Sequence, residues 1–228
     1  MIDQTLFLLA LYNSRGSNRQ ALSRLILDHK TKLSMDHVDW EVSQAHWDEA
    51  QRQCAALDCM GIQFVPGYQL AKWHSRTAAI PPMLFWRGSK SAIRHRGVAI
   101  VGARRARKSL QWVEALAEFC AFKGIPIISG GALGVDSAAH EGTLRGNGTT
   151  TAYLGVAADR VYPAQNRGLF GRIIENGGAI ASEHPPGTTT LKYEHAHRNR
   201  LIIMQAQAVV VAEAGPKSGT LSTVRWAA

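Results

Sequence analysis

Two segments in the second half of the chain combine glycine with residues that bind phosphate. Arg104 and Arg105 follow directly after Gly102, and a second segment reads Ser129-Gly130-Gly131-Ala132-Leu133-Gly134. Glycine turns let backbone N–H groups approach an anion, and the N-terminus of a following helix carries partial positive charge. Arginine adds a planar fork of donors that matches phosphate. These residue types and their spacing favour phosphate binding, in a nucleotide or in a polynucleotide.

Charge is distributed unevenly along the 228 residues, which carry a formal net charge of +9. Residues 1–86 hold eight basic and eight acidic side chains, whereas residues 87–228 hold 18 basic and nine acidic ones. A stretch without any acidic residue contains eight basic ones: Arg87, Lys90, Arg94, Arg96, Arg104, Arg105, Arg107 and Lys108. An excess of this kind favours a polyanionic partner such as nucleic acid.

The composition excludes several classes of protein. Hydrophobic residues make up 46% of the chain, which is ordinary for a globular protein and too high for a disordered one. No apolar run approaches the roughly 18 residues that span a bilayer. Asp3 stands where a signal peptide would carry a positive charge. We therefore expect a cytoplasmic protein that does not contact a membrane.

The sequence predicts no metal site and no cofactor. The cysteines, at positions 54, 59 and 120, form no CxxC pair, which argues against a disulfide framework and a zinc site. His195 and His197 are two residues apart, and such residues do not share a face of a helix. Five carboxylates of the second half show no metal-binding spacing: Asp136, Glu141, Asp159, Glu183 and Glu213.

Short apolar runs alternate with amphipathic stretches from residue 97 onward. This alternation predicts an α/β fold with a doubly wound, mostly parallel sheet. The predicted strands are 98–101, 125–128, 150–154, 179–182 and 208–211, and the predicted helices are 109–123, 136–145, 166–175, 195–205 and one that starts at Ser218. In such sheets ligands bind beyond the carboxyl ends of the strands, and the glycine-rich and basic segments fall there.

The first part of the chain reads as helical. Helices are predicted at 19–28 and from Ser43 through Met60, and residues 62–65 and 83–86 are predicted to be extended. Polar and basic residues then interrupt the pattern near 89–96. We therefore predict three parts: a small helical domain (1–65), a linker with a connecting strand (66–96) and an α/β domain (97–228).

Six motifs follow one another over about 125 residues of the α/β part. They are Gly102-Ala103-Arg104, Ser129-Gly130-Gly131-Ala132-Leu133-Gly134-Val135-Asp136-Ser137-Ala138-Ala139-His140, Tyr162-Pro163-x-x-Asn166, Ser182-Glu183-x-Pro185-Pro186-Gly187, Arg198-Asn199-Arg200-Leu201-Ile202 and Ser218-Gly219-Thr220-Leu221. Their order and spacing resemble the DprA/Smf family (DNA-processing protein A). Residues 61–88 also resemble that family's link between a small helical, SAM-like domain and a Rossmann-like DNA-binding domain.

The resemblance implies binding of single-stranded DNA without sequence preference and without catalysis. It places the protein in DNA uptake during natural transformation, with RecA, which it loads, and a second copy of the chain as expected protein partners. The residues expected to bind DNA are Gly102, Arg104, Arg105, Arg107, Lys108, Ser129, Gly130, Gly131, Asn166 and Arg167. A second set is expected to brace the loops, with its arginines paired to its carboxylates: Asp136, His140, Glu183, Arg198, Asn199, Arg200, Glu213, Ser218, Gly219 and Thr220.

Three features depart from the family pattern. Leu133 stands where a basic residue is frequent, and His195-Ala196-His197 stands where a Phe-Pro or similar pair is usual before Arg-Asn-Arg. The chain also ends at Ala228, so we expect the Rossmann-like domain to be incomplete at its C-terminus. This last departure weakens the expectation of a homodimer and of RecA loading more than that of DNA binding. Tyr162 and Phe170 are candidates for stacking under DNA bases, with ordinary packing as the competing interpretation.

A different function on a related Rossmann-like fold stays open. It is a sensor that binds a nucleotide or a nucleotide-derived signal. A phosphoribohydrolase is disfavoured, because such enzymes carry Gly-Gly-x-Gly-Thr-x-x-Glu and Thr223 stands here in place of the glutamate. Without that carboxylate the general acid/base is missing. The spacing of Gly130, Gly131 and Gly134 also differs from the dinucleotide-binding GxGxxG pattern.

Overall fold

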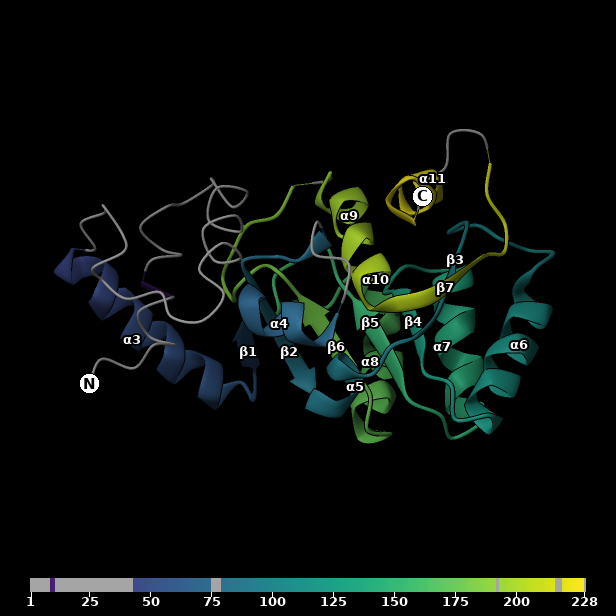
Figure 1. Ribbon diagram of the computed structural model, residues 1–228, viewed down its shortest axis with the longest axis horizontal. Helices are drawn as coiled ribbons and strands as arrows, with labels where there is room; N and C mark the ends of the chain where they lie inside the picture. Colours follow the sequence, from purple (N-terminus) through teal and green to yellow (C-terminus); the bar gives the residue numbers. More distant parts are fainter. Residues whose placement is uncertain (1–8, 11–42, 75–78, 192, 216–218, 228) are drawn as a thin grey trace.

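The structure of the chain, a computed structural model, describes residues 9–10, 43–74, 79–191, 193–215 and 219–227. Its centre is a seven-stranded sheet with the strand order β1-β2-β6-β5-β4-β3-β7 (Figure 1). The strands are β1 (Gln63–Pro66), β2 (Met83–Gly88), β3 (Gly97–Val101), β4 (Ile127–Gly130), β5 (Thr150–Tyr153), β6 (Ala179–Ser182) and β7 (Ala206–Val211). The helices are α3 (Gln44–Cys59), α4 (Gly67–Trp73), α5 (Lys90–Arg94), α6 (Leu110–Phe122), α7 (Val135–Arg145), the 3-10 turn η3 (Ala164–Asn166), α8 (Arg167–Glu175), α9 (Glu194–His197), α10 (Asn199–Gln205) and α11 (Thr220–Ala227).

The five strands from β3 to β7 are parallel to one another, which confirms the predicted doubly wound α/β fold. β4, β5 and β6 follow β3 on one side, whereas β7 returns to the other side of β3. The strand order therefore reverses between β3 and β7. In doubly wound sheets a crevice for ligands opens beyond the carboxyl ends of the strands at such a reversal.

β2 pairs antiparallel with β6, and β1 pairs antiparallel with β2 at the edge of the sheet. Phe85 of β2 pairs with Ser182 of β6, so the segment predicted as a linker contributes a strand to the same sheet. The short helices α4 and α5 lie in that segment as well, and the apolar pattern of the sequence does not predict them. The division into residues 1–65, 66–96 and 97–228 stays a prediction.

The helix predicted after Ser43 is confirmed as α3. The backbone N–H of Ser43 donates to Nδ1 of His46, three residues later, over 3.3 Å, so the first turn carries a capping box. The helix predicted at 19–28 lies outside the described residues.

Helices cover both faces of the sheet (Figure 1). α6, α7 and α8 pack on one face, and α5 and α10 pack on the other. Side chains of β3 alternate between the two layers, as a strand requires. Ala99 and Val101 join the core that contains Leu201 of α10, whereas Ile100 between them joins the core that contains Val113 of α6.

The helix predicted at 195–205 is divided at Arg198 into α9 and α10. The backbone N–H of Leu201 donates to the carbonyl of Arg198 over 2.8 Å, which is the shorter i+3 spacing of a tight turn. The Arg198 side chain is buried, and its Nη1 donates to the carbonyl of Tyr153 at the end of β5. The helix is thus interrupted at the residue whose side chain is buried at the carboxyl ends of the strands.

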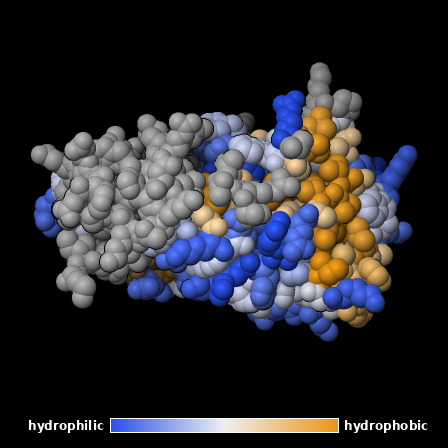
Figure 2. All heavy atoms as spheres, viewed as in Figure 1, coloured by the Kyte–Doolittle hydropathy of each residue, from blue (hydrophilic) through white to orange (hydrophobic). Residues whose placement is uncertain are grey.

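Exposed apolar side chains gather on α6, α11 and the end of β7, where Figure 2 shows a hydrophobic band. Phe119 and Phe122 of α6 are among the most exposed of them, and Val211 lies on β7. Among the described residues, no helix is both long enough and apolar enough to cross a membrane.

Substituting Gly142 by alanine tests how closely α6 and α7 approach. A Cβ at Gly142 would lie 2.2 Å from the carbonyl oxygen of Glu114, so the two helices must separate. We expect Gly142→Ala to destabilise the fold by about 1–3 kcal/mol in urea unfolding. Gly171→Ala on α8 is the matched control, because nothing lies within 4 Å of its added Cβ. That substitution should stabilise the fold by about 0.5–1 kcal/mol, and equal effects at the two positions would contradict this account.

Candidate nucleic-acid interface

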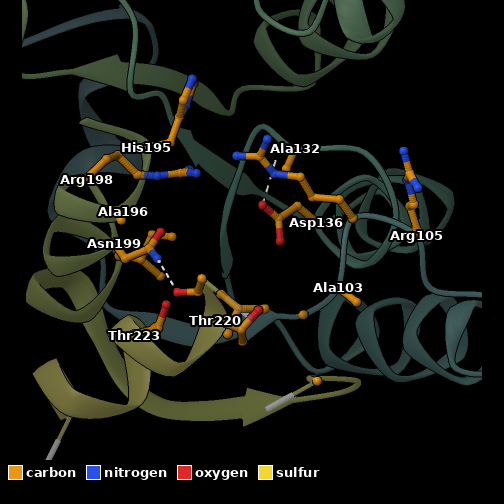
Figure 3. Close-up of a pocket in the computed structure, with 16 residues that line it drawn as sticks. Ala103, Arg105, Ala132, Asp136, His195, Ala196, Arg198, Asn199, Thr220 and Thr223 are labelled. Carbon is orange, nitrogen blue, oxygen red and sulfur yellow. Dashed lines mark hydrogen bonds between the residues drawn. The ribbon is translucent and has the colours of Figure 1, made fainter. Parts of the chain in front are cut away.

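A cavity of about 810 Å³ lies at the carboxyl ends of β3 and β7, where the strand order reverses (Figure 3). The loop after β3 forms one wall, and α9, α10 and the start of α11 form the other. Its lining includes Gly102, Arg104, Arg105, Ala132, Asp136, His195, Arg198, Asn199, Gly219, Thr220 and Thr223. The structure thus brings together residues that are up to 121 positions apart in the sequence.

Backbone hydrogen bonds hold the loop after β3 in place. The N–H of Ala103 donates to the carbonyl of Glu213 over 2.7 Å, and the N–H of Val135 donates to the carbonyl of Ala103 over 3.3 Å. A Cβ at Gly102 would lie 2.6 Å from the Val135 side chain, so this position accepts no larger residue without a shift. The loop is therefore tied to the end of β7 and to the start of α7.

The basic side chains of this loop point to solvent. Arg104, Arg105, Arg107 and Lys108 are all exposed, and the first two also line the cavity. Exposed cations at a glycine-containing turn are suited to bind a polyanion, because they stay charged and hydrated in the free protein at no cost in burial. This part of the predicted DNA-binding set lies together on one surface.

Other members of the predicted set are buried. Ser129 donates from its hydroxyl to the carbonyl of Ile100 over 2.6 Å, inside the sheet. A Cβ at Gly130 would lie 2.2 Å from Nη1 of Arg198. A Cβ at Gly131 would lie 2.4 Å from the Leu154 side chain. The structure therefore places these residues against protein side chains, and their small size admits those neighbours.

Asn166 and Arg167 lie together at the start of α8 but face different surroundings. Asn166 is buried, and its Nδ2 donates to the carbonyl of Gly131 over 2.9 Å and to the Ser137 hydroxyl over 2.9 Å. It thereby fixes the glycine turn after β4. Arg167 is exposed and adds a further cation to the surface.

Arg198 and Asp136 form the charged floor of the cavity (Figure 3). Burial raises the pKa of Asp136, and the Arg198 charge and an N–H from Ala132, at 3.3 Å, oppose that rise. Burial likewise lowers the pKa of Arg198, against the effect of Asp136. Each group thus offsets part of the cost of burying the other.

The remaining residues of the bracing set contact neighbouring loops. Arg200 lies 2.5 Å from a Glu183 oxygen and donates to the carbonyl of Ala79 over 3.0 Å. Asn199 donates to the Ser222 hydroxyl on α11 over 2.8 Å and to the carbonyl of Gly219 over 3.3 Å.

Glu213 and the glycine-rich turn before α11 complete that set. Glu213 accepts from the Ser109 hydroxyl over 2.9 Å. Thr220 is buried and lines the cavity, whereas Ser218 lies outside the described residues.

His140 connects α7 to two strands of the sheet. Its Nε2 lies 2.8 Å from the carbonyl of Gly130 on β4, and its Nδ1 lies 2.7 Å from the Thr150 hydroxyl on β5. Burial lowers its pKa to about 4. The imidazole is therefore neutral at pH 7, with Nε2 assigned as the donor to the carbonyl.

Sequence reasoning named Tyr162 as a stacking candidate but missed two groupings of side chains. Tyr162 and His195 lie with ring centroids 5.1 Å apart beside a second cavity of about 210 Å³, and Tyr162 is 48% exposed. The other aromatic candidate, Phe170, is buried in the core. The second group gathers Glu183, His184 and Glu194. The motif departure at His195 was the available signal for the first group. The second group was hidden because nine residues separate His184 from Glu194 in the sequence.

Fold and site together define a Rossmann-like α/β protein with a cationic face at the reversal of its strand order. Comparison with protein-family models adds that residues 68–228 match DNA recombination-mediator protein A. The chain belongs to this family, the one named DprA/Smf, as the six motifs predict.

Individual relatives agree with this assignment. The chain is 38% identical to Protein Smf of Synechocystis over 71% of its own length and 41% of the relative. It thus spans about two fifths of that curated relative. A solved structure of DNA processing protein A from Helicobacter pylori, whose description concerns its single-stranded DNA binding mode, has 32% identity and a TM-score of 0.64 over 73% of this chain and 75% of that one. The DprA structure from Streptococcus pneumoniae has 26% identity and a TM-score of 0.63 over 99% of this chain and 78% of that one.

The lowered pKa of His140 predicts that the fold is less stable in acid. An unfolded histidine titrates near pH 6.5, whereas the folded one titrates near 4, so the unfolded state binds more protons between these values. Stability should be full above about pH 6.5 and fall by roughly 1.4 kcal/mol per pH unit between 6.5 and 4 for each such histidine. His74, whose pKa burial also lowers to about 4, should add a similar loss.

Urea unfolding at several pH values measures this slope. His140→Gln should reduce the slope without abolishing it, because His74 remains. An unchanged slope in His140→Gln would show that the folded His140 does not exclude its proton.

Proposed function

We propose that this chain binds single-stranded DNA without sequence preference, as a DNA-processing protein that acts in the cytoplasm during natural transformation. The observation that carries the proposal is the cluster of exposed cations from Arg104 to Lys108 beside the large cavity. Membership in the recombination-mediator family and the likeness to the Helicobacter pylori protein support it.

The phosphate backbone is the part of the ligand that the cationic face fits. Arg104 and Arg105 line both cavities, so a strand that crosses the loop after β3 meets two guanidinium groups. Contacts to phosphate carry no sequence information, which agrees with binding to any sequence. The exposed ring of Tyr162, backed by His195, offers a surface on which a base stacks, and stacking also tolerates every base.

We infer a binding role rather than catalysis. Thr223 is buried and lines the large cavity, so the position that holds the glutamate of related hydrolases faces the cavity with a hydroxyl. A hydroxyl at this position does not supply the proton transfer that the glutamate would supply. The buried Asp136 lies beside Arg198, whose charge it offsets.

RecA loading and a homodimer belong to the same proposal and rest on the family alone. We further propose that residues 97–228 form the DNA-binding domain, after a helical domain (1–65) and a connecting segment (66–96). The pairing of β2 with β6 means that the connecting segment contributes a strand to the sheet of that domain.

Arg104→Ala tests the placement of the DNA-binding surface. We expect single-stranded oligonucleotides of every sequence to bind more weakly, because one phosphate contact is lost. The slope of log K against log salt should fall by about 0.7 for that contact. Fluorescence anisotropy at two or more salt concentrations measures both quantities.

Arg172→Ala is the matched control for this experiment. Arg172 is an exposed arginine of α8 that pairs with Glu141 and lines neither cavity, and its removal changes the net charge equally. Affinity and salt slope should stay at the parent values. Equal losses in both variants would reduce the effect to net charge, and no loss in Arg104→Ala would place the DNA elsewhere.

A nucleotide-derived ligand is the second candidate function, and the size of the cavity favours it. About 810 Å³ falls in the range of small-molecule sites. Under the DNA-binding proposal, free nucleoside monophosphates at millimolar concentration should leave the thermal unfolding midpoint unchanged. A rise in the midpoint, by the linkage of binding to folding, would favour the sensor.

A further inference from the structure

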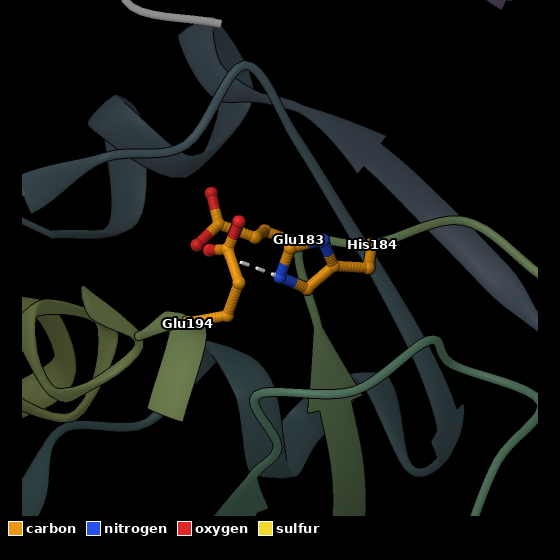
Figure 4. A group of neighbouring side chains, drawn as sticks. All are labelled: Glu183, His184 and Glu194. Atoms are coloured by element: carbon orange, nitrogen blue, oxygen red, sulfur yellow. Dashed lines mark ion pairs between the residues drawn. The ribbon is translucent and has the colours of Figure 1, made fainter. Parts of the chain in front are cut away.

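Three side chains of types that commonly bind metal ions converge near the start of α9 (Figure 4). Glu183 and His184 follow directly after β6, and Glu194 is the first residue of α9. One ligand atom from each lies within 4.8 Å of the other two, and all three residues are buried. We propose that Glu183, His184 and Glu194 bind a divalent transition-metal ion, Zn²⁺ in the first place.

The distances fit a small ion. Nε2 of His184 lies 3.5 Å from Oε2 of Glu194. With bonds of about 2.0–2.2 Å to zinc, neighbouring ligand atoms of a tetrahedral site lie about 3.3–3.6 Å apart. This pair is already at that separation, and the other pairs lie within 4.8 Å. Water fills the fourth position, as in other sites with three protein ligands.

The second oxygen of Glu183 has its own partner. Oε2 of Glu183 lies 2.5 Å from Nη2 of Arg200, which holds the carboxylate, and Oε1 lies 3.5 Å from Nδ1 of His197. The loop that carries His184 is held as well, because the N–H of Ala158 donates to its carbonyl over 3.0 Å. Ligands on braced positions lose little freedom when an ion binds.

The charges of the cluster favour a cation. Glu183 and Glu194 are buried carboxylates that lie close together, and a divalent cation between them would offset the repulsion between their charges. The side chain of His197 is 38% exposed to solvent. Its Nδ1 lies 3.5 Å from Oε1 of Glu183 and 3.9 Å from Oε2 of Glu194. It is therefore a partly exposed neighbour of both buried carboxylates.

The donor set indicates the class of ion. One imidazole nitrogen and two carboxylate oxygens suit zinc and its first-row neighbours, whereas Mg²⁺ and Ca²⁺ prefer oxygen alone. Bound there, the ion ties the loop after β6 to α9. Because α9 also carries His195 into the large cavity, the ion would fix one wall of that cavity.

The test measures metal binding by the full chain without DNA, so it does not depend on the proposed DNA-binding function. Protein stripped with a chelator is titrated with Zn²⁺ in competition with a chromogenic chelator. We expect one tight site per chain, lost or weakened by roughly 100-fold or more in Glu194→Gln. Zn²⁺ should also raise the thermal unfolding midpoint of the parent and not that of the variant.

Two controls separate this site from other histidines and cysteines. His95→Gln removes an exposed histidine outside the cluster and should keep the parent affinity. Co²⁺ bound to the unmodified chain should give the visible bands of a four-coordinate site without a thiolate charge-transfer band, and this needs no variant to fold. Absence of a tight site, equal Zn²⁺ affinity in Glu194→Gln, or a thiolate band would each overturn the proposal.

Discussion

The burial of Arg198 at the carboxyl edge of the parallel strands is the constraint on which the site depends. Its guanidinium donates to the carbonyl of Tyr153 and lies beside Asp136, so both neighbours must approach it closely. Gly130 is the residue at the end of β4 because any Cβ there would meet the guanidinium. Arg198 also lies at the tight turn between α9 and α10, so its burial holds the end of α9 next to the cavity.

Two kinds of arginine meet at this cavity, and their surroundings give them different tasks. The exposed pair, Arg104 and Arg105, keeps its hydration until a ligand displaces it, so its charge is available to a polyanion. Arg198 has already lost its hydration and is compensated by Asp136 and a backbone carbonyl. We expect removal of the first kind to alter ligand binding, whereas removal of the second leaves the buried carboxylate of Asp136 without its nearby positive charge.

Periodicity was enough to predict most of the fold. The apolar runs predicted the parallel strands, and the glycine and polar residues between them predicted most helix ends to within two residues. The segments of β1 and β2 were predicted as extended, but the pairing of β2 with β6 was not, because pairing between distant segments leaves no mark in local spacing. α4 and α5 were missed because helices of seven and five residues are too short to show a helical period.

The same distinction between local features and contacts of distant segments holds for the site. Motif order identified the family and the exposed arginines, which are local features. It did not show that Ser129 and Gly130 lie beneath side chains, since burial depends on what the rest of the chain brings there.

The Glu183, His184 and Glu194 group makes this limit concrete. Ligand spacing in a sequence is informative when one helix or turn carries the ligands, and here the end of a strand and the start of a helix share them. Because the three ligands lie on the loop after β6 and on α9, binding of the ion favours the position of α9 that brings them together. That position of α9 in turn favours binding of the ion.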